Sequence, residues 1–242
     1  MAPGPAQSKE NTDIRRRMSY QAVLFDLDGT LADTLDDIAD AVNHALALHG
    51  LPTHPRDAYR TLVGEGVDRL VEKAVPDNRG DLHDSVYGGV RDYYLAHMLD
   101  KTAAYDGVPD MLDALAARGI PMAVLSNKPG PATERIVAEL FGRWEFAAVV
   151  GQTPEEPHKP DPGAALRIAA AVGAAPGRCL FLGDTSTDME TAVAAGMFPV
   201  GALWGFREAD ELLAFGARAL IERPMDLIPL LDGEPARDGR PA

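Results

Sequence analysis

The sequence predicts an α/β fold whose core is a parallel β-sheet flanked by helices, with a helical domain inserted after the first strand. Short apolar runs at residues 22–25, 122–125 and 179–182 are typical of buried strands. From residue 106 to residue 230 strand and helix patterns alternate, which is the signature of a parallel sheet with right-handed crossovers. Residues 34–103, by contrast, show helical periodicity throughout.

Two aspartates follow the first predicted strand, in the run Phe25-Asp26-Leu27-Asp28-Gly29. Open α/β sheets bind ligands at the carboxyl ends of their strands, and strand alternation would point Asp26 and Asp28 the same way. Two carboxylates this close repel unless a cation or a proton separates them. The pair therefore predicts a metal site and acid–base chemistry, although a lone Asp-x-Asp is about as often a turn or a helix cap.

Three apolar stripes at helical spacing indicate a helical bundle between residues 34 and 103. Prolines and a glycine separate the stripes. Their members are Ile38, Ala41, Val42, Ala45, Leu46 and Leu48; Val67, Leu70, Val71, Ala74 and Val75; and Val86, Val90, Tyr93, Tyr94 and Met98. We expect residues 34–103 to form this helical domain and residues 19–33 and 104–231 to form the α/β core. Residues 1–18 and 232–242 have the composition of disordered tails.

Three further segments bring polar side chains to the same edge of the predicted sheet. Ser126 and Asn127 follow the strand at residues 122–125, Asp184 and Asp188 follow the strand at residues 179–182, and Lys159 lies in a Pro-rich loop. Taken singly, Ser126 or Asp184 is more often a helix cap, and Lys159 a solvated cation. Because three strand ends and one loop converge, the combination predicts a single site.

In their order and spacing these segments resemble the four motifs of the haloacid dehalogenase (HAD) superfamily of phosphatases. FDLDGTL is similar to the first motif, Ser126 holds the Ser/Thr position of the second, Lys159 matches the third, and GDTSTD has the Gly-Asp-x-x-x-Asp form of the fourth. The resemblance spans about residues 20–230 and implies a Rossmann-like core with an inserted helical cap domain. The run LSNKP also resembles the branch that contains phosphoglycolate phosphatases.

The resemblance implies a role for each site residue. Asp26 would be the nucleophile that forms an aspartyl-phosphate, and Asp28 would serve as general acid and then as general base. Mg²⁺ would be held by Asp26, the main-chain carbonyl of Asp28 and Asp184, while Asp188 would hold a ligand or its waters or orient Lys159. Ser126, Asn127 and Lys159 would bind the phosphate, with Lys128 as a further candidate.

The inserted helical domain is expected to set the substrate. Gly64, in Val63-Gly64-Glu65-Gly66-Val67, resembles a loop that dips toward the active site, and a plain turn before a helix explains it equally well. Arg69 is a candidate for pairing with a substrate carboxylate. Asp28 argues against a dehalogenase, and Thr30 favours a hydrolase over a sugar phosphomutase of the β-phosphoglucomutase type, which usually has Val there. A pyrophosphatase or a non-catalytic binding protein could be built on the same fold, although the intact acidic positions disfavour the second.

The amino-acid composition limits the kinds of partner that the protein is expected to bind. The net charge of −14 argues against a nucleic-acid or anionic-membrane surface. No apolar run approaches the roughly 20 residues that a membrane helix needs. The single cysteine, Cys179, lies within an apolar strand and is interpreted as core filling. We therefore expect a cytoplasmic enzyme, a monomer or homodimer, that acts on a small phosphorylated metabolite.

Overall fold

The computed structural model describes residues 20–155 and 157–232, and its core is a six-stranded sheet with the strand order β5-β4-β1-β6-β7-β8. Every neighbouring pair of strands is parallel, which confirms the predicted fold class. The strands are β1 (Ala22–Phe25), β4 (Met122–Pro129), β5 (Ala148–Gln152), β6 (Cys179–Gly183), β7 (Phe198–Ala202) and β8 (Ala219–Ile221). The predicted tails lie outside the described residues, apart from Asp232.

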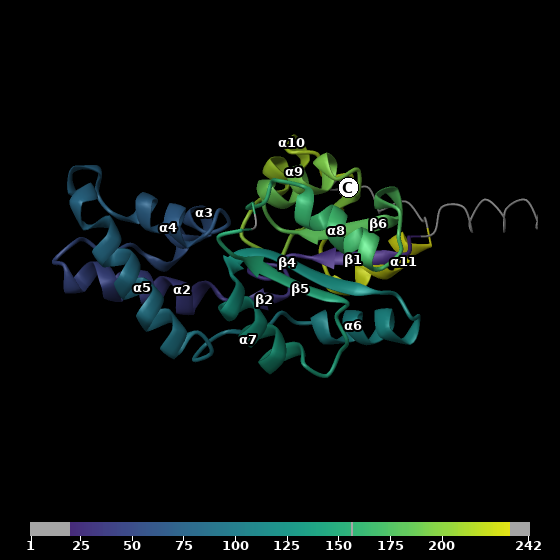
Figure 1. Ribbon diagram of the computed structural model, residues 1–242, viewed down its shortest axis with the longest axis horizontal. Helices are drawn as coiled ribbons and strands as arrows, with labels where there is room; N and C mark the ends of the chain where they lie inside the picture. The colour runs from purple at the N-terminus through teal and green to yellow at the C-terminus, as the bar shows by residue number, and fades with distance from the viewer. Residues whose placement is uncertain (1–19, 156, 233–242) are drawn as a thin grey trace, which may run out of the picture.

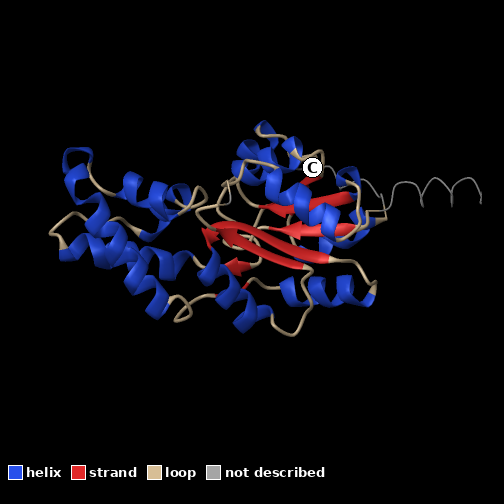
Figure 2. Cartoon of the chain, viewed as in Figure 1, coloured by secondary structure: helices blue, strands red, loops and turns tan. Residues whose placement is uncertain are grey.

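Helices cover both faces of the sheet (Figures 1 and 2). Because side chains alternate along a strand, Val23 and Phe25 of β1 pack on one face, and Ala22 and Leu24 on the other. The first face is covered by α6 (Val108–Ala117), α7 (Gly130–Phe141) and α11 (Leu227–Leu231), and the second by α8 (Gly163–Ala171) and α9 (Ser186–Ala194). The remaining core elements are η3 (Pro176–Arg178), α10 (Ala209–Ala214) and η4 (Pro224–Asp226). Burial on both faces explains why the strand sequences are largely apolar up to their carboxyl ends.

A second group of helices, residues 35–97, lies beside the sheet and is called the helical unit here (Figure 1). It contains α2 (Leu35–Leu48), η1 (Arg56–Ala58), α3 (Tyr59–Leu62), α4 (Val67–Ala74), η2 (Asp77–Leu82) and α5 (His83–His97). These helices bury an apolar core of their own, in which Tyr59, Val71 and Val86 are fully enclosed. Its two connections to the sheet run side by side, because β2 (Ala32–Asp33) pairs antiparallel with β3 (Ala103–Ala104).

The carboxyl ends of the strands point toward the helical unit, as the arrowheads in Figure 2 show. Functional side chains at this edge therefore lie between the two parts of the molecule. Cys179 of β6 is fully buried among the apolar side chains under α8, as its interpretation as core filling requires. Within residues 20–155 and 157–232, no helix combines the length and the apolar character needed to cross a bilayer.

Candidate active site

The turn after β1 places Asp26 and Asp28 in different surroundings. Asp26 is buried, with its Oδ1 atom 2.9 Å from Nζ of Lys159. Asp28 accepts hydrogen bonds from Oγ1 of Thr34 at 2.7 Å and from Nζ of Lys128 at 2.8 Å. Because β1 ends at Phe25, the turn that follows sets the directions of both side chains. Both carboxylates nevertheless border the same cavity.

Three buried carboxylates gather beside this turn. Each of Asp26, Asp184 and Asp188 offers one oxygen, and these oxygens lie within 4.8 Å of one another. Asp184 is fixed by the hydroxyl of Thr30 and by the N–H of Phe206, both of which donate to it at 2.8 Å. Asp188 uses Oδ1 to contact Nζ of Lys159 at 2.6 Å, and Oδ2 accepts from Thr185 to cap the N-terminus of α9.

The cluster carries unbalanced negative charge. Three carboxylates face the single ammonium group of Lys159, so two charges are left without a partner among these four residues. Burial, together with the nearby Asp188, raises the pKa of Asp26 to about 7, and burial also raises the pKa of Asp184 well above its usual range. Burial alone would lower the pKa of Lys159, but the carboxylates of Asp188 and Asp26 raise it instead.

This cluster fits a hard divalent cation. All of its donors are carboxylate oxygens, the ligands that Mg²⁺ and Ca²⁺ prefer, and two excess negative charges match the charge of such an ion. The Oδ1 atom of Asp26 is buried and, apart from its ion pair with Lys159, has no hydrogen-bond partner among the described residues, which leaves it free to bind a metal. The acidic cluster is therefore a candidate metal site.

Asp28 belongs to a second buried ion pair. Nζ of Lys128 donates to both carboxylate oxygens of Asp28, at 2.8 and 3.0 Å, and lies 4.6 Å from the ring centroid of Tyr94 on α5. Lys128 reaches this place because β4 continues to Pro129, beyond the predicted strand end at Leu125. Burial alone would lower the pKa of Lys128, but Asp28 raises it. The Tyr94 hydroxyl is buried without a hydrogen-bond partner among the described residues.

Asn127 connects three segments of the chain at the edge of the sheet. Its Nδ2 group donates to the carbonyl oxygens of Gly64 and Lys159, both at 3.1 Å, while its Oδ1 accepts from the N–H of Lys159 at 2.8 Å. Neighbouring Ser126 is buried and lines the cavity. The structure thus brings Ser126, Asn127, Lys159 and Gly64 together, and the Asn127 side chain holds the Gly64 loop against the core.

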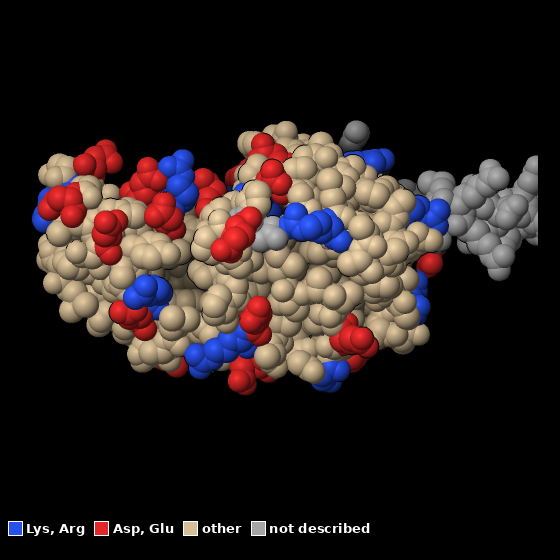
Figure 3. Space-filling model, in the orientation of Figure 1, with Lys and Arg blue, Asp and Glu red and all other residues tan. Residues whose placement is uncertain are grey.

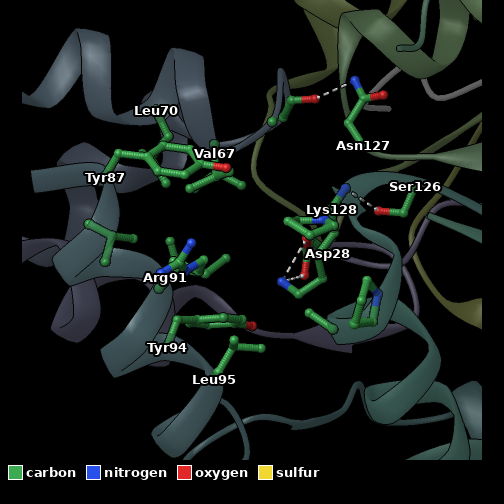
Figure 4. A pocket seen from close by; sticks show the side chains of 18 of the residues that line it. Asp28, Val67, Leu70, Tyr87, Arg91, Tyr94, Leu95, Ser126, Asn127 and Lys128 are labelled. Atoms are coloured by element: carbon green, nitrogen blue, oxygen red, sulfur yellow. Dashed lines mark hydrogen bonds and ion pairs between the residues drawn. The ribbon is translucent and has the colours of Figure 1, made fainter. Parts of the chain in front are cut away.

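A cavity of about 210 Å³ lies between the core and the helical unit (Figure 4). On the core side it is lined by Asp26, Asp28, Ser126 and Asn127, among others. The structure does not bring Arg69 to it: the Arg69 guanidinium is exposed and pairs with Glu72 and Glu65. Instead, Tyr87, Arg91 and Tyr94 of α5 border the cavity. The spacing of four and three residues between them indicates in the sequence that they share one face of the helix. It does not show whether that face borders a cavity or faces solvent, because an arginine on an amphipathic helix fits either place.

The loop that follows β7 joins the acidic cluster to the helical unit. Phe206 donates its N–H to Asp184 and packs its ring into the core of the helical unit. Arg207 donates to the carbonyl oxygens of Val63 at 3.0 Å and Thr61 at 3.2 Å, and Arg60 donates to the carbonyl oxygen of Gly205. Asp184 of the acidic cluster and the wall of the cavity are therefore held by one loop.

A parallel sheet that delivers three carboxylates and a lysine to one edge, beneath a helical unit, defines a class of hydrolases. A family model described as haloacid dehalogenase-like hydrolase matches residues 20–196, and the chain belongs to this family. Phosphoglycolate phosphatase from Pseudomonas putida is 34% identical over 218 residues, which cover 86% of this chain and 78% of that protein. The phosphoglycolate phosphatase from Aquifex aeolicus is 32% identical over 212 residues, covering 88% and 97%.

Solved structures show the same relationship. The crystal structure of a predicted phosphoglycolate phosphatase from Haemophilus somnus matches with a TM-score of 0.80 at 26% identity, covering 87% of this chain and 97% of that one. These similarities confirm the family expected from the four motifs. The protein is a phosphoric monoester hydrolase that is similar to phosphoglycolate phosphatases.

Proposed function

We propose that the protein is a Mg²⁺-dependent phosphatase that hydrolyses a small phosphomonoester through an aspartyl-phosphate on Asp26. The observation that carries this proposal is the buried group of Asp26, Asp184, Asp188 and Lys159, of which Asp26 borders the cavity. The relatives named above make 2-phosphoglycolate the first candidate substrate.

The side chains around the cavity divide the reaction into two displacements. Asp26 attacks phosphorus and forms the aspartyl-phosphate, while Ser126 and Lys159 contact the phosphoryl oxygens and offset their charge. Asp28 gives a proton to the leaving alcohol and then takes one from the water that hydrolyses the intermediate. Lys128 and Thr34 hold the Asp28 carboxylate in place through three hydrogen bonds.

The metal would be held by Asp26, the main-chain carbonyl of Asp28 and Asp184. When bound, Mg²⁺ polarises the phosphoryl group and neutralises charge that builds up on its oxygens. Oδ1 of Asp188 is paired with the ammonium of Lys159 and Oδ2 accepts from the N-cap residue Thr185, whereas among the described residues the two oxygens of Asp184 accept from the neutral donors Thr30 and Phe206. We therefore assign Asp188 to orienting Lys159 rather than to direct coordination.

The helical elements would act as a cap over this chemistry. We propose that residues 34–103 form a cap domain on the core of residues 19–33 and 104–231, with the β2–β3 pair as the hinge. Closure would exclude water from the cavity while the intermediate exists. We further propose that the enzyme acts in the cytoplasm as a monomer or homodimer.

A panel of small phosphomonoesters, assayed with Mg²⁺ and with EDTA, tests the proposal. We expect inorganic phosphate and free alcohol in a one-to-one ratio, only when Mg²⁺ is present and without any sugar bisphosphate activator. Release of phosphate from no ester, or equal release in EDTA, would show the proposal to be wrong. Conversion of sugar 1-phosphate to 6-phosphate faster than phosphate release would identify a mutase instead.

A further inference from the structure

One face of α5 supplies the polar groups on the cap side of the cavity. Tyr87, Arg91 and Tyr94 are four and three residues apart, so they lie on the same side of the helix. Figure 4 shows the Arg91 side chain extending from α5 into the cavity, toward Asp28 on the opposite wall. The rest of this wall is apolar and includes Ile38, Val63, Val67, Leu70, Val90 and Leu95.

Among the described residues one guanidinium nitrogen of Arg91 has no partner, whereas the other cation of the cavity is buried against Asp28. Arg91 and Lys128 are the cationic side chains that line the cavity in the described part of the chain. Lys128 is neutralised by Asp28. Arg91 contacts Oδ1 of neighbouring Asp92 through Nε at 3.0 Å and Nη2 at 2.9 Å, and among the described residues Nη1 has no partner. This pair is exposed on both sides, so it competes weakly with a ligand.

The wall contributed by the helical unit is poor in hydrogen-bond acceptors. Within residues 35–97, the side chains that line the cavity include no Asp, Glu, Asn or Gln, and the carbonyl oxygen of Gly64 already accepts from Asn127. A sugar phosphate would bring several hydroxyl donors into these apolar surroundings and leave some of them unpaired. A terminal anion, by contrast, finds the free edge of Arg91.

We propose that Arg91 is a specificity-determining residue that binds a carboxylate at the end of the substrate remote from the phosphate. The substrates would be short, hydroxyl-poor phosphomonoesters with a terminal carboxylate. The planar guanidinium can hold both carboxylate oxygens at once. This inference rests on the proposed phosphatase function and assigns to Arg91 the recognition that the sequence had suggested for Arg69.

The two arginines provide a matched test. The value of kcat/KM is measured for 2-phosphoglycolate and for its neutral amide in the wild type, Arg91→Gln and Arg69→Gln. We expect Arg91→Gln to lower kcat/KM for the acid by about 10- to 100-fold, the range for a lost hydrogen bond to a charged group, and to change the value for the amide by less than about threefold. Arg69→Gln, whose guanidinium lies outside the cavity, should leave both values unchanged.

The outcomes separate this inference from the proposed function. Equal losses for acid and amide in Arg91→Gln, or a larger loss in Arg69→Gln, would overturn the role of Arg91. If the wild type hydrolyses the amide or glucose 6-phosphate more efficiently than 2-phosphoglycolate, the carboxylate class is wrong, although the phosphatase function stands. If no phosphomonoester releases phosphate in the presence of Mg²⁺, both proposals fail together.

Discussion

At the scale of single residues, Asp26 shows a conflict between function and stability. The folded protein surrounds this carboxyl group with Asp184 and Asp188 and removes it from water, so the fold favours the neutral form. Lys159 offsets part of the cost, because its ammonium lies between Asp26 and Asp188 with only 3% of the side chain exposed. The proposed nucleophile is therefore held in an environment that opposes its ionisation until a cation binds.

Asp26→Asn should separate these two properties. We expect turnover to fall below a few per cent of the wild-type value, because an amide cannot accept the phosphoryl group as a carboxylate does. In EDTA at pH 8, however, the variant should be more stable than the wild type. The pKa of Asp26 is raised to about 7 in the folded state, so the stability gained from its neutral form is complete below about pH 4 and is lost as the pH rises through 7. The neutral Asn side chain avoids that loss.

Thermal unfolding in EDTA at pH 4.5 and pH 8 measures this effect, alongside a phosphate-release assay. The difference in melting temperature between Asp26→Asn and wild type should grow from the lower pH to the higher one. A difference that is independent of pH would show that Asp26 does not titrate in this range. Substantial phosphatase activity in the variant would instead remove Asp26 from the role of nucleophile.

At the scale of structural elements, two turns close tightly on Asp184. Gly29, in the turn after β1, has φ +83°, and a Cβ atom there would lie 2.2 Å from Oδ2 of Asp184. Gly205, in the loop after β7, would place a Cβ atom 2.2 Å from the Cβ of Asp184. The absence of side chains at these positions lets the backbone of both turns approach the carboxylate. The spacing of the acidic cluster therefore depends on the turns as much as on the aspartates.

Gly29→Ala, with Gly50→Ala as its control, tests this dependence. Gly50 also has positive φ, +64°, but a Cβ atom there meets nothing within 4 Å. We expect Gly50→Ala to cost only the backbone strain of about 1–2 kcal/mol in the free energy of unfolding, with unchanged Mg²⁺ affinity. Gly29→Ala adds the collision with Asp184 and should weaken Mg²⁺ binding by about tenfold or more in calorimetric titration. Equal Mg²⁺ affinities in the two variants would contradict the argument.

The elements also show what a sequence can and cannot predict. Largely apolar strands and the polar residues at their ends were predictable, because a parallel sheet buries both faces and collects its strand ends at one edge. The pairing of Lys128 with Asp28 spans 100 positions and depends on the extra length of β4, which no local pattern indicates. Arg69 and Arg91 are alike in sequence, since both lie on amphipathic helices. Only the packing of α4 and α5 against the core decides which of them faces the cavity.

At the scale of the whole molecule, the charge distribution opposes the chemistry proposed for the cavity. The chain carries a net charge of −14, and Figure 3 shows Asp and Glu side chains spread over the helical unit and the adjoining core. A phosphomonoester dianion approaching from solution is repelled by this field before it reaches Arg91 and the metal site. The attraction that holds the substrate is therefore short-range, whereas the repulsion that slows its approach is long-range.

This difference in range predicts an unusual response to salt. Raising ionic strength from 10 to 150 mM shortens the Debye length from about 30 Å to about 8 Å, which screens the long-range repulsion more than contacts inside the cavity. At saturating Mg²⁺ we expect kcat/KM for 2-phosphoglycolate to rise by about 2- to 5-fold over this interval, while kcat stays nearly constant. Potassium chloride titrations of initial rates provide the measurement. A fall in kcat/KM would mean that local cations already steer the substrate, and that the net charge is too distant from the cavity to matter.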